Sequence, residues 1–154
     1  MKQISLTKGK YVLVDDEDFE YLNQWKWYFD RYAMRNEKVN GKRRKVLIHR
    51  IIMNTPEGFE TDHINGDKLD NRRANLRICT TSQNQANKKK SLNKSSVYKG
   101  VSRLKDKWIA QVVCDKKLTF IGLFEQEYHA ALAADLWNRD LYGTFAKTNF
   151  TAAC

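Results

Sequence analysis

The sequence predicts an α+β protein, with a small N-terminal α+β region followed by a three-stranded antiparallel sheet packed on one helix. Short strand-like runs separated by turn residues recur along the 154-residue chain, and one long stretch near the C-terminus has apolar residues at helical spacing. A polar stretch without aromatic residues separates the two parts. We therefore expect an N-terminal domain at residues 1–90, a basic linker at 91–96 and a C-terminal domain at 97–154.

The first region opens with an alternating strand candidate, Gly9–Val14. The acidic run Asp15–Glu20 follows it and is typical of a helix start, because carboxylates interact favourably with the positive end of the helix dipole. Trp25 and the aromatic residues after it are candidates for a core. Asn40 and Gly41 then predict a hairpin turn.

The C-terminal region reads as three strands and a helix. The strand candidates are Val97–Leu104, Trp108–Cys114 and Leu118–Phe124. Gln126–Tyr142 predicts the helix, which we expect to end at Gly143. An apolar face at helical spacing supports this prediction, and its members are Ala130, Ala134, Trp137 and Leu141.

The net charge is +10 with a pI near 9.6, and residues 31–60 carry +5 while residues 61–100 carry +6. The densest points are Lys42–Lys45, Arg72–Arg73 and Lys88–Lys90. This concentration favours a polyphosphate partner, because each neutralised phosphate releases counterions. The alternative is an ordinary solvated surface.

Other classes of protein are disfavoured by composition. No apolar run approaches the length of a membrane span, and the N-terminus lacks the apolar core of a signal peptide, so we expect a cytoplasmic protein without a membrane partner. Cys79, Cys114 and Cys154 are scattered and contain no C-x-x-C pair. We therefore expect neither a disulfide framework nor a zinc site.

The stretch Thr61–Asn84 holds the candidate catalytic residues. Asp62 and His63 close a predicted strand, Leu76–Cys79 reads as the return strand, and Asn84 follows on a predicted helix. A carboxylate and an amide oxygen suit Mg²⁺, and a histidine that is neutral near pH 7 can take a proton from water. Adjacent strand residues point to opposite faces, so Asp62 and His63 need a local bend to share one site. This combination of a carboxylate, an amide oxygen and a histidine indicates phosphodiester hydrolysis.

The segment DHINGDKLDNRRANLR resembles the HNH endonuclease signature of the ββα-metal fold. The spacing also matches, since Asn75 follows His63 by twelve residues and Asn84 follows Asn75 by nine. The likeness extends over residues 1–90 and is typical of phage-type proteins. It implies that His63 is the general base, that Asp62 and Asn84 bind Mg²⁺ or Mn²⁺, and that Asn75 braces the loop and orients His63. Asn84 stands where the last histidine of the motif is usual, as in homing-type nickases.

Several polar residues have a possible non-catalytic role as well. An Asp-His pair beside Asn-Gly turns is often ordinary loop polarity, although the matching asparagines argue against this here. We expect packing or a phosphate contact for His49 rather than catalysis, and a structural or exposed position for His129. We expect Asn71 and Asn87 to be loop and helix-surface residues.

Residues 97–150 resemble the plant ethylene-response-factor type domain, called Apetala-two. The matching landmarks are Tyr98–Val101, Trp108–Ala110, Ile121–Phe124, the alanine-rich helix and Asn149-Phe150. Such domains lay their sheet in the DNA major groove, but several arginines of the family's DNA-facing surface are missing here. A structural or protein-binding sheet is the alternative. The DNA-contacting residues that we expect, from the linker region and this sheet, are Lys88, Lys89, Lys90, Lys99, Arg103, Lys105, Gln111 and Phe120.

Together these features predict a metal-dependent, homing-type HNH endonuclease that nicks double-stranded DNA at a site located by its C-terminal domain. We expect a monomer, with a dimer as the alternative, acting in the cytoplasm of a bacterial or phage-infected cell. A catalytically inactive DNA-binding regulator is the alternative function. An RNA-directed nuclease fits less well, because the deep major groove of RNA does not admit a sheet.

Overall fold

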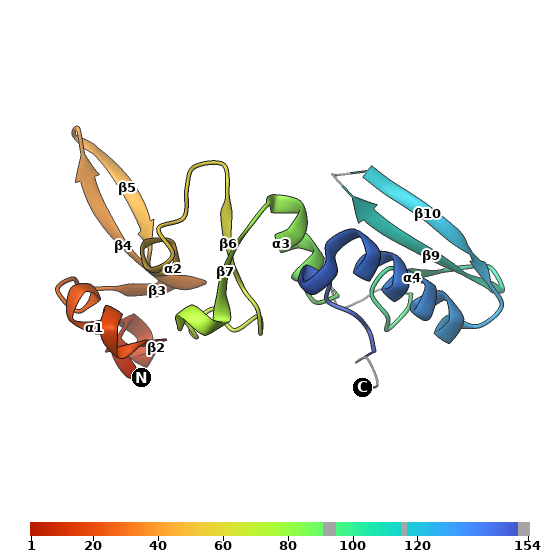
Figure 1. Cartoon of the computed structure of the whole chain (residues 1–154), viewed down its shortest axis with the longest axis horizontal. Coiled ribbons are helices and arrows are strands. Elements are labelled where there is room, and N and C mark those ends of the chain that lie inside the picture. The colour runs from red at the N-terminus through yellow and green to blue at the C-terminus, as the bar shows by residue number, and fades with distance from the viewer. Residues whose placement is uncertain (91–94, 115–116, 151–154) are drawn as a thin grey trace. The chain divides into compact units, whose positions relative to one another are not determined.

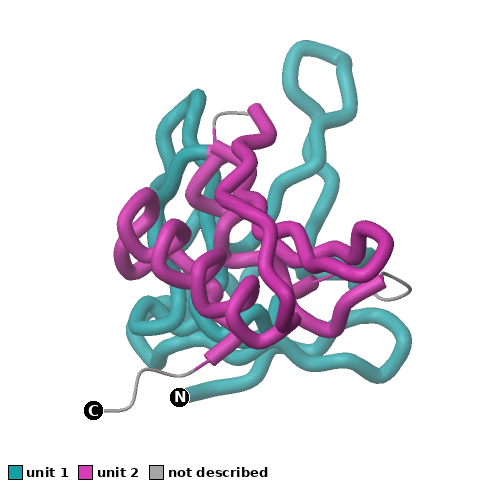
Figure 2. The backbone as a smooth tube through the Cα atoms, turned by 90° about the vertical axis from the view of Figure 1, so that its right-hand side faces the viewer, with its two compact units in different colours: residues 1–80 teal, residues 81–154 magenta. Residues whose placement is uncertain are grey.

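The computed structural model describes residues 1–90, 95–114 and 117–150, and the chain divides into two compact units, residues 1–80 and 81–154 (Figures 1 and 2). Both units combine helices with small antiparallel sheets, which confirms the predicted α+β class. The linker predicted at residues 91–96 begins about ten residues after the boundary between the two units. Residues 91–94 of that linker lie outside the described residues.

The first unit contains three small sheets. β1 pairs with β2, β3 and β5 flank β4, and β6 pairs with β7, all antiparallel. The strands are β1 Lys2–Ser5, β2 Tyr11–Val14, β3 Tyr28–Asp30, β4 Tyr32–Val39, β5 Lys42–Leu47, β6 Glu60–His63 and β7 Leu76–Cys79. The helices are α1 Asp16–Leu22 and α2 Ile48–Ile52, with single 3-10 turns η1 Thr7–Gly9 and η2 Arg73–Asn75.

One apolar cluster holds these elements together. Val12 and Val14 of β2, Leu22 of α1 and Ile48 of α2 are all buried in it, with Trp27 packed beside them. The indole Nε1 of Trp27 donates a hydrogen bond to the carbonyl of Leu22 at 2.8 Å, so this large ring is buried with its polar atom satisfied.

The long loop between β6 and β7 is tied back to the N-terminal elements. Leu13 of β2 donates to the carbonyl of Leu69 at 2.8 Å and accepts from the backbone nitrogen of Asn71 at 2.9 Å. The guanidinium of Arg73 donates to the Asp18 carboxylate of α1 at 2.9 and 2.7 Å. The acidic start of α1 therefore also holds the loop that leads into β7.

The second unit contains a three-stranded antiparallel sheet in the order β10-β9-β8, with one long helix packed against it. The elements are α3 Thr81–Asn87, β8 Val101–Leu104, β9 Lys107–Cys114, β10 Lys117–Phe124, α4 Glu127–Tyr142 and the 3-10 turn η3 Gly143–Phe145. Ala130, Ala131 and Ala134 are fully buried and allow α4 to lie close to the sheet. A Cβ at Gly100 would lie 2.8 Å from the carbonyl oxygen of Gln111, so this position requires glycine.

The buried face of α4 differs from the predicted one. Ala130 and Ala134 are buried, but Trp137 and Leu141 are 44% and 38% exposed. Asp135 is buried in their place because its carboxylate accepts hydrogen bonds from the backbone nitrogens of Asn149 and Phe150. The polar anchoring of the segment after α4 therefore sets which face of the helix is covered.

Among the described residues, no helix combines the length and apolar character that crossing a membrane requires.

Candidate active site

The β6–β7 pair places Asp62 and His63 beside each other in a regular antiparallel ladder. Asp62 lies opposite Arg77, and His63 lies opposite Leu76. Because successive strand residues point to opposite faces, the two side chains have different surroundings. Asp62 accepts hydrogen bonds from Arg77, whereas the ring of His63 contacts Asn71 and two aromatic side chains.

Asp62 and Arg77 form a largely buried ion pair. Nη2 of Arg77 lies 2.8 Å and its Nε 2.9 Å from Oδ2 of Asp62, and the two side chains are 6% and 15% exposed, Asp62 being the more buried. A buried carboxylate must be paired or hydrogen bonded to be stable. Arg77 therefore supplies the charged partner that a carboxylate buried on β6 requires.

Asn71 determines which nitrogen of His63 carries a hydrogen. Nε2 of His63 lies 3.4 Å from Oδ1 of Asn71, and Nδ2 of Asn71 donates to the carbonyl of Lys68 at 3.1 Å. Since the amide nitrogen of Asn71 is used by Lys68, its oxygen faces His63 and can only accept. Nε2 of His63 must then be the protonated nitrogen, which leaves Nδ1 as the basic atom.

Two further rings enclose His63. The His49 ring on α2 lies 5.1 Å from it at 84°, and the Tyr32 ring at the start of β4 stacks on it at 6.2 Å. Burial lowers the pKa of His49 to about 3, with His63 and Arg50 adding to the effect. Nδ1 of His49 is buried without a hydrogen-bond partner among the described residues. His49 is therefore a neutral packing group at pH 7.

His63 itself is buried but remains close to carboxylates. Burial lowers its pKa below the ordinary value, while the hydrogen bond to Asn71 and the charges of Asp62, Asp67 and Asp70 act in the opposite direction. The ring is therefore neutral at pH 7, which is the state that a general base needs.

Asn75 braces the loop between β6 and β7. Its Nδ2 donates to the carbonyl of Asp70 at 2.8 Å and to Oδ1 of Asn65 at 3.0 Å, and its Oδ1 accepts from the backbone nitrogen of Asn65 at 3.0 Å. Its own carbonyl accepts from the backbone nitrogen of Ile64 at 2.9 Å, next to His63. Asn75 thus holds the backbone on both sides of the loop, and Asn71, which contacts the imidazole, projects from that same loop.

Comparison with known proteins gives the family. Residues 46–86 match the family model described as HNH endonuclease, and this range contains α2, β6, the braced loop and β7. An uncharacterized HNH endonuclease of Acanthamoeba polyphaga mimivirus is 30% identical over 149 residues, and the match covers 92% of this chain and 76% of that protein. The chain belongs to the HNH endonuclease family.

The HNH residues expected to bind metal are Asp62 and Asn84. Asp62 lies on β6, and Asn84 lies on α3, which groups with the second unit, so their joint role stays a prediction. No group of three or more His, Cys, Asp or Glu side chains in residues 1–90, 95–114 and 117–150 is arranged to hold a metal ion. The donors are nevertheless a carboxylate and an amide oxygen, and this chemistry fits Mg²⁺ or Mn²⁺, which also take waters and phosphate oxygens.

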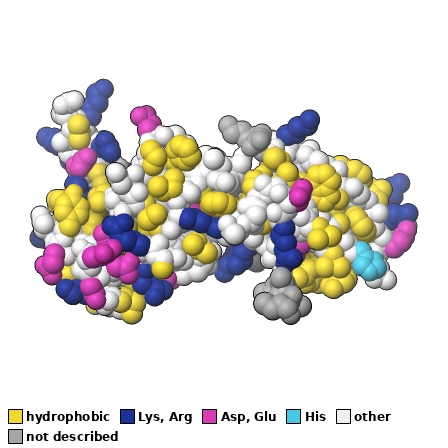
Figure 3. Space-filling model, in the orientation of Figure 1, with side chains coloured by type: hydrophobic (Ala, Val, Ile, Leu, Met, Phe, Trp, Pro, Cys, Tyr) yellow, Lys and Arg dark blue, Asp and Glu magenta, His cyan; other side chains and the backbone are white. Residues whose placement is uncertain are grey.

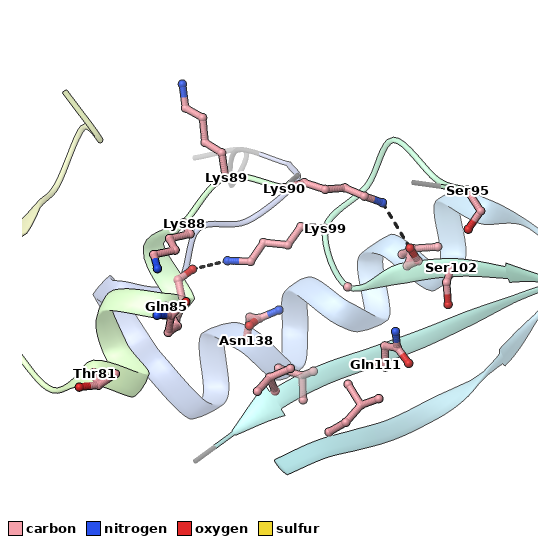
Figure 4. Close-up of a pocket in the computed structure, with 16 residues that line it drawn as sticks. Thr81, Gln85, Lys88, Lys89, Lys90, Ser95, Lys99, Ser102, Gln111 and Asn138 are labelled. Atoms are coloured by element: carbon pink, nitrogen blue, oxygen red, sulfur yellow. Dashed lines mark hydrogen bonds between the residues drawn. The ribbon is translucent and has the colours of Figure 1, made fainter. Parts of the chain in front are cut away.

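The lysines expected to contact DNA around the linker fall into two classes. Lys88 and Lys89 are exposed, and both are among the residues that line a cavity of about 760 Å³ (Figure 4). Lys90 donates to the carbonyls of Tyr98 and Val101, and Lys99 donates to the carbonyl of Ala86. Burial lowers the pKa of Lys99 to about 8.

In the C-terminal sheet of this HNH nuclease, successive residues of β9 alternate between the two faces. Ala110 and Val112 of β9 are buried on the side of α4, whereas Val113 is 54% exposed on the other face. Gln111 pairs with Phe120 of β10 on that outer face, where Phe120 is 61% exposed. The role of Gln111 and Phe120 in DNA contact, like the likeness to Apetala-two domains, stays a prediction, since the family match ends at residue 86.

The two remaining predicted DNA contacts lie at the β8–β9 turn. Arg103 pairs with Trp108 and its guanidinium lies 5.7 Å from that ring, so it shares the side of the sheet that Trp108 occupies. Lys105 is exposed in the turn, and its carbonyl accepts from Nε of Arg103 at 3.1 Å.

Proposed function

We propose that this HNH endonuclease is metal dependent and of the homing type, and that it nicks double-stranded DNA in the cytoplasm of a bacterial or phage-infected cell. The family supports a DNA-cleaving nuclease. The net charge of +10 supports a polyanionic substrate. We propose that it acts as a monomer with one active site, which cuts one strand in each event.

The environment of His63 carries this proposal. A buried imidazole with Nε2 directed at Asn71 presents Nδ1 as its basic atom, and burial keeps the ring neutral at pH 7. Asn75 fixes the loop from which Asn71 projects. A histidine held in one orientation and one tautomer is suited to accept a proton from water.

The reaction that we propose is hydrolysis of a phosphodiester. Nδ1 of His63 accepts a proton from a water molecule while the water oxygen forms a bond to phosphorus. The bond between phosphorus and the 3′ oxygen breaks, and that oxygen takes a proton from solvent. The products are a 5′-phosphate and a 3′-hydroxyl end.

Asp62 and Asn84 are the residues that would hold a divalent cation. When bound, the cation would polarise the phosphate and stabilise the charge on the leaving oxygen. Arg77 keeps the Asp62 carboxylate fixed on β6 through two hydrogen bonds.

The second unit would locate the target through the outer face of its sheet. That face carries the half-buried Gln111, which can bond a base edge, and the exposed Phe120, which can contact a thymine methyl group. Replacing Phe120 by serine should reduce preference for the native site while leaving cleavage chemistry intact. Leu136→Ser is the matched control, because Leu136 is 66% exposed and Phe120 is 61% exposed, but Leu136 lies on α4.

The test of the proposed function is cleavage of a supercoiled plasmid that carries the genomic DNA flanking the native gene. With Mg²⁺ or Mn²⁺ we expect open circles, and with EDTA we expect none. Linear product at early times would contradict nicking. If the protein binds the plasmid and retards it in a gel but cleaves it with neither Mg²⁺ nor Mn²⁺, the inactive DNA-binding regulator is favoured instead.

A further inference from the structure

The β4–β5 hairpin extends from the first unit as a two-stranded ribbon (Figure 1). Its strands pair without interruption from Met34 opposite Leu47 to Val39 opposite Lys42. Asn40 and Gly41 close the turn with φ values of 50° and 77°, as a tight hairpin of this kind requires. From Asn36 to Lys45 every residue is exposed apart from the half-buried Glu37, so this distal part adds nothing to the apolar core.

The distal ribbon carries a dense positive charge. Five cationic residues and one acidic residue lie between Asn36 and Lys45. In Figure 3, Lys and Arg side chains surround the tip of this projection. The cationic residues are Lys38, Lys42, Arg43, Arg44 and Lys45.

Internal ion pairs account for only part of this charge. Glu37 lies 3.9 Å from Arg44 and 3.1 Å from Arg35, and Lys45 lies 4.0 Å from Asp30. Lys38, Lys42 and Arg43 make no ion pair with any residue that the structure describes. Like charges on a paired ribbon repel one another, so this arrangement is stabilised when an external anion binds.

The base of the ribbon is fixed to the candidate active site. β4 begins at Tyr32, whose ring stacks on His63, and β5 runs directly into α2, which carries His49. Arg35 stacks on the rings of Trp25 and Trp27 at 4.7 and 5.8 Å. The direction of the ribbon is therefore coupled to the position of His63.

We propose that the ribbon Asn36–Lys45 binds the DNA duplex beside the cleaved phosphate, with Lys38, Lys42 and Arg43 on backbone phosphates. The proposal rests on the proposed nuclease function. The major groove of B-DNA admits a two-stranded ribbon, and its phosphates supply the missing counter-charges. Val39 lies seven positions after Tyr32 in the chain. At about 3.4 Å per residue the tip lies roughly 24 Å along the ribbon, which is about 7 base pairs of B-DNA.

The test removes the three unpaired charges. Lys38→Gln, Lys42→Gln and Arg43→Gln are combined, and binding to a fluorescein-labelled 40-base-pair duplex is measured by anisotropy in EDTA over a range of NaCl concentrations. Each phosphate contact contributes about 0.9 to the slope of log K against log salt, so the slope should become shallower by about 2 to 3. An unchanged slope would overturn the proposal.

A matched control separates a local contact from general attraction. Lys8, Lys10 and Lys26 are exposed lysines of the same unit outside the ribbon, so their triple glutamine variant loses the same charge. The proposal requires this variant to keep the wild-type slope. An equal loss of slope in both triple variants would overturn it, and circular dichroism melting confirms that both remain folded.

A second measurement tests the position of the contact. On a duplex containing the mapped nick, hydroxyl-radical footprinting should show wild-type protection about 7 base pairs to one side of the nick, and the ribbon variant should lose only that protection. Loss of protection at the nick instead would contradict the proposal. Tighter binding of an RNA hairpin than of duplex DNA would also contradict it. Wild type that neither binds nor nicks DNA would overturn the proposed function itself.

Discussion

The side-chain oxygen of Asn71 faces Nε2 of His63 at 3.4 Å, and the amide of Asn71 is held in this orientation by the carbonyl of Lys68. Asn71 is completely buried and its backbone nitrogen bonds to Leu13 of β2. The orientation of the imidazole therefore depends on contacts between two distant parts of the chain. This relationship leaves Nδ1 as the basic atom of the neutral His63 ring.

Replacing Asn71 by leucine should reduce DNA cleavage by about 10- to 100-fold, because His63 loses the acceptor that selects its tautomer. Nitrogen chemical shifts of the imidazole, measured by long-range proton–nitrogen NMR, should change from a single Nε2-protonated form to a mixture. Asn23→Leu, at an exposed position, is the control. Wild-type cleavage and an unchanged imidazole spectrum in Asn71→Leu would contradict this role.

Replacing Arg77 by leucine should lower the free energy of unfolding by about 3 kcal/mol, because the buried carboxylate of Asp62 loses its cationic partner. The double variant Asp62→Leu/Arg77→Leu removes both charges and should recover much of that stability. Urea unfolding of the two variants measures the difference. If the double variant is less stable than Arg77→Leu, the ion pair is not the source of the effect.

The neutral state of His49 predicts a stability change at acidic pH. Burial lowers the pKa of His49 to about 3, whereas the unfolded chain binds this proton near pH 6.5. The stabilisation is therefore complete above pH 6.5 and decreases as the pH falls towards 3, by up to about 1.4 kcal/mol per pH unit.

His49→Leu should therefore have a flatter dependence of unfolding free energy on pH between 6.5 and 4.5 than wild type. Urea titrations at several pH values measure this difference. His129→Leu, at an exposed position on α4, is the control and should keep the wild-type slope. Parallel curves for wild type and His49→Leu would show that His49 is not the group responsible.

Asp135→Ala should loosen the segment that follows α4. The carboxylate of Asp135 accepts from the backbone nitrogens of Asn149 and Phe150 and from Nδ2 of Asn149, which in turn donates to the carbonyl of Lys99. Since these half-buried donors would lose their buried acceptor, we expect a loss of about 1 to 3 kcal/mol and faster amide exchange at both residues. Unchanged amide exchange at Asn149 would contradict the assigned contact.

Local sequence signals predicted much of the fold. The return strand Leu76–Cys79, the Asn40-Gly41 turn and the long C-terminal helix all depend on neighbouring residues, and the structure confirms them within one residue. The covered face of α4 was predicted only in part. Apolar periodicity favoured Trp137, but the hydrogen bonds of Asp135 to a distant segment decide which face is buried.

Less of the candidate site could be predicted from the sequence, because it also depends on contacts between distant segments of the chain. Asp62, His63 and Asn75 belong to a recognisable motif, but Asn71 was expected to be an ordinary loop residue. Its contact with His63 arises because Leu13 of β2 holds the loop in place. The buried position of His49 agrees with a packing role, although nothing in the spacing indicated that it lies against His63.

The most direct test of the central claim is a paired measurement on His63→Ala, with His129→Ala as the matched control. Cleavage of duplex DNA is followed under single-turnover conditions with Mg²⁺, and binding to the same duplex is measured in EDTA. We predict that His63→Ala loses cleavage by at least about 100-fold and binds DNA as tightly as wild type, while His129→Ala is unchanged in both. Cleavage by His63→Ala at the wild-type rate would contradict the assignment of His63 as the general base.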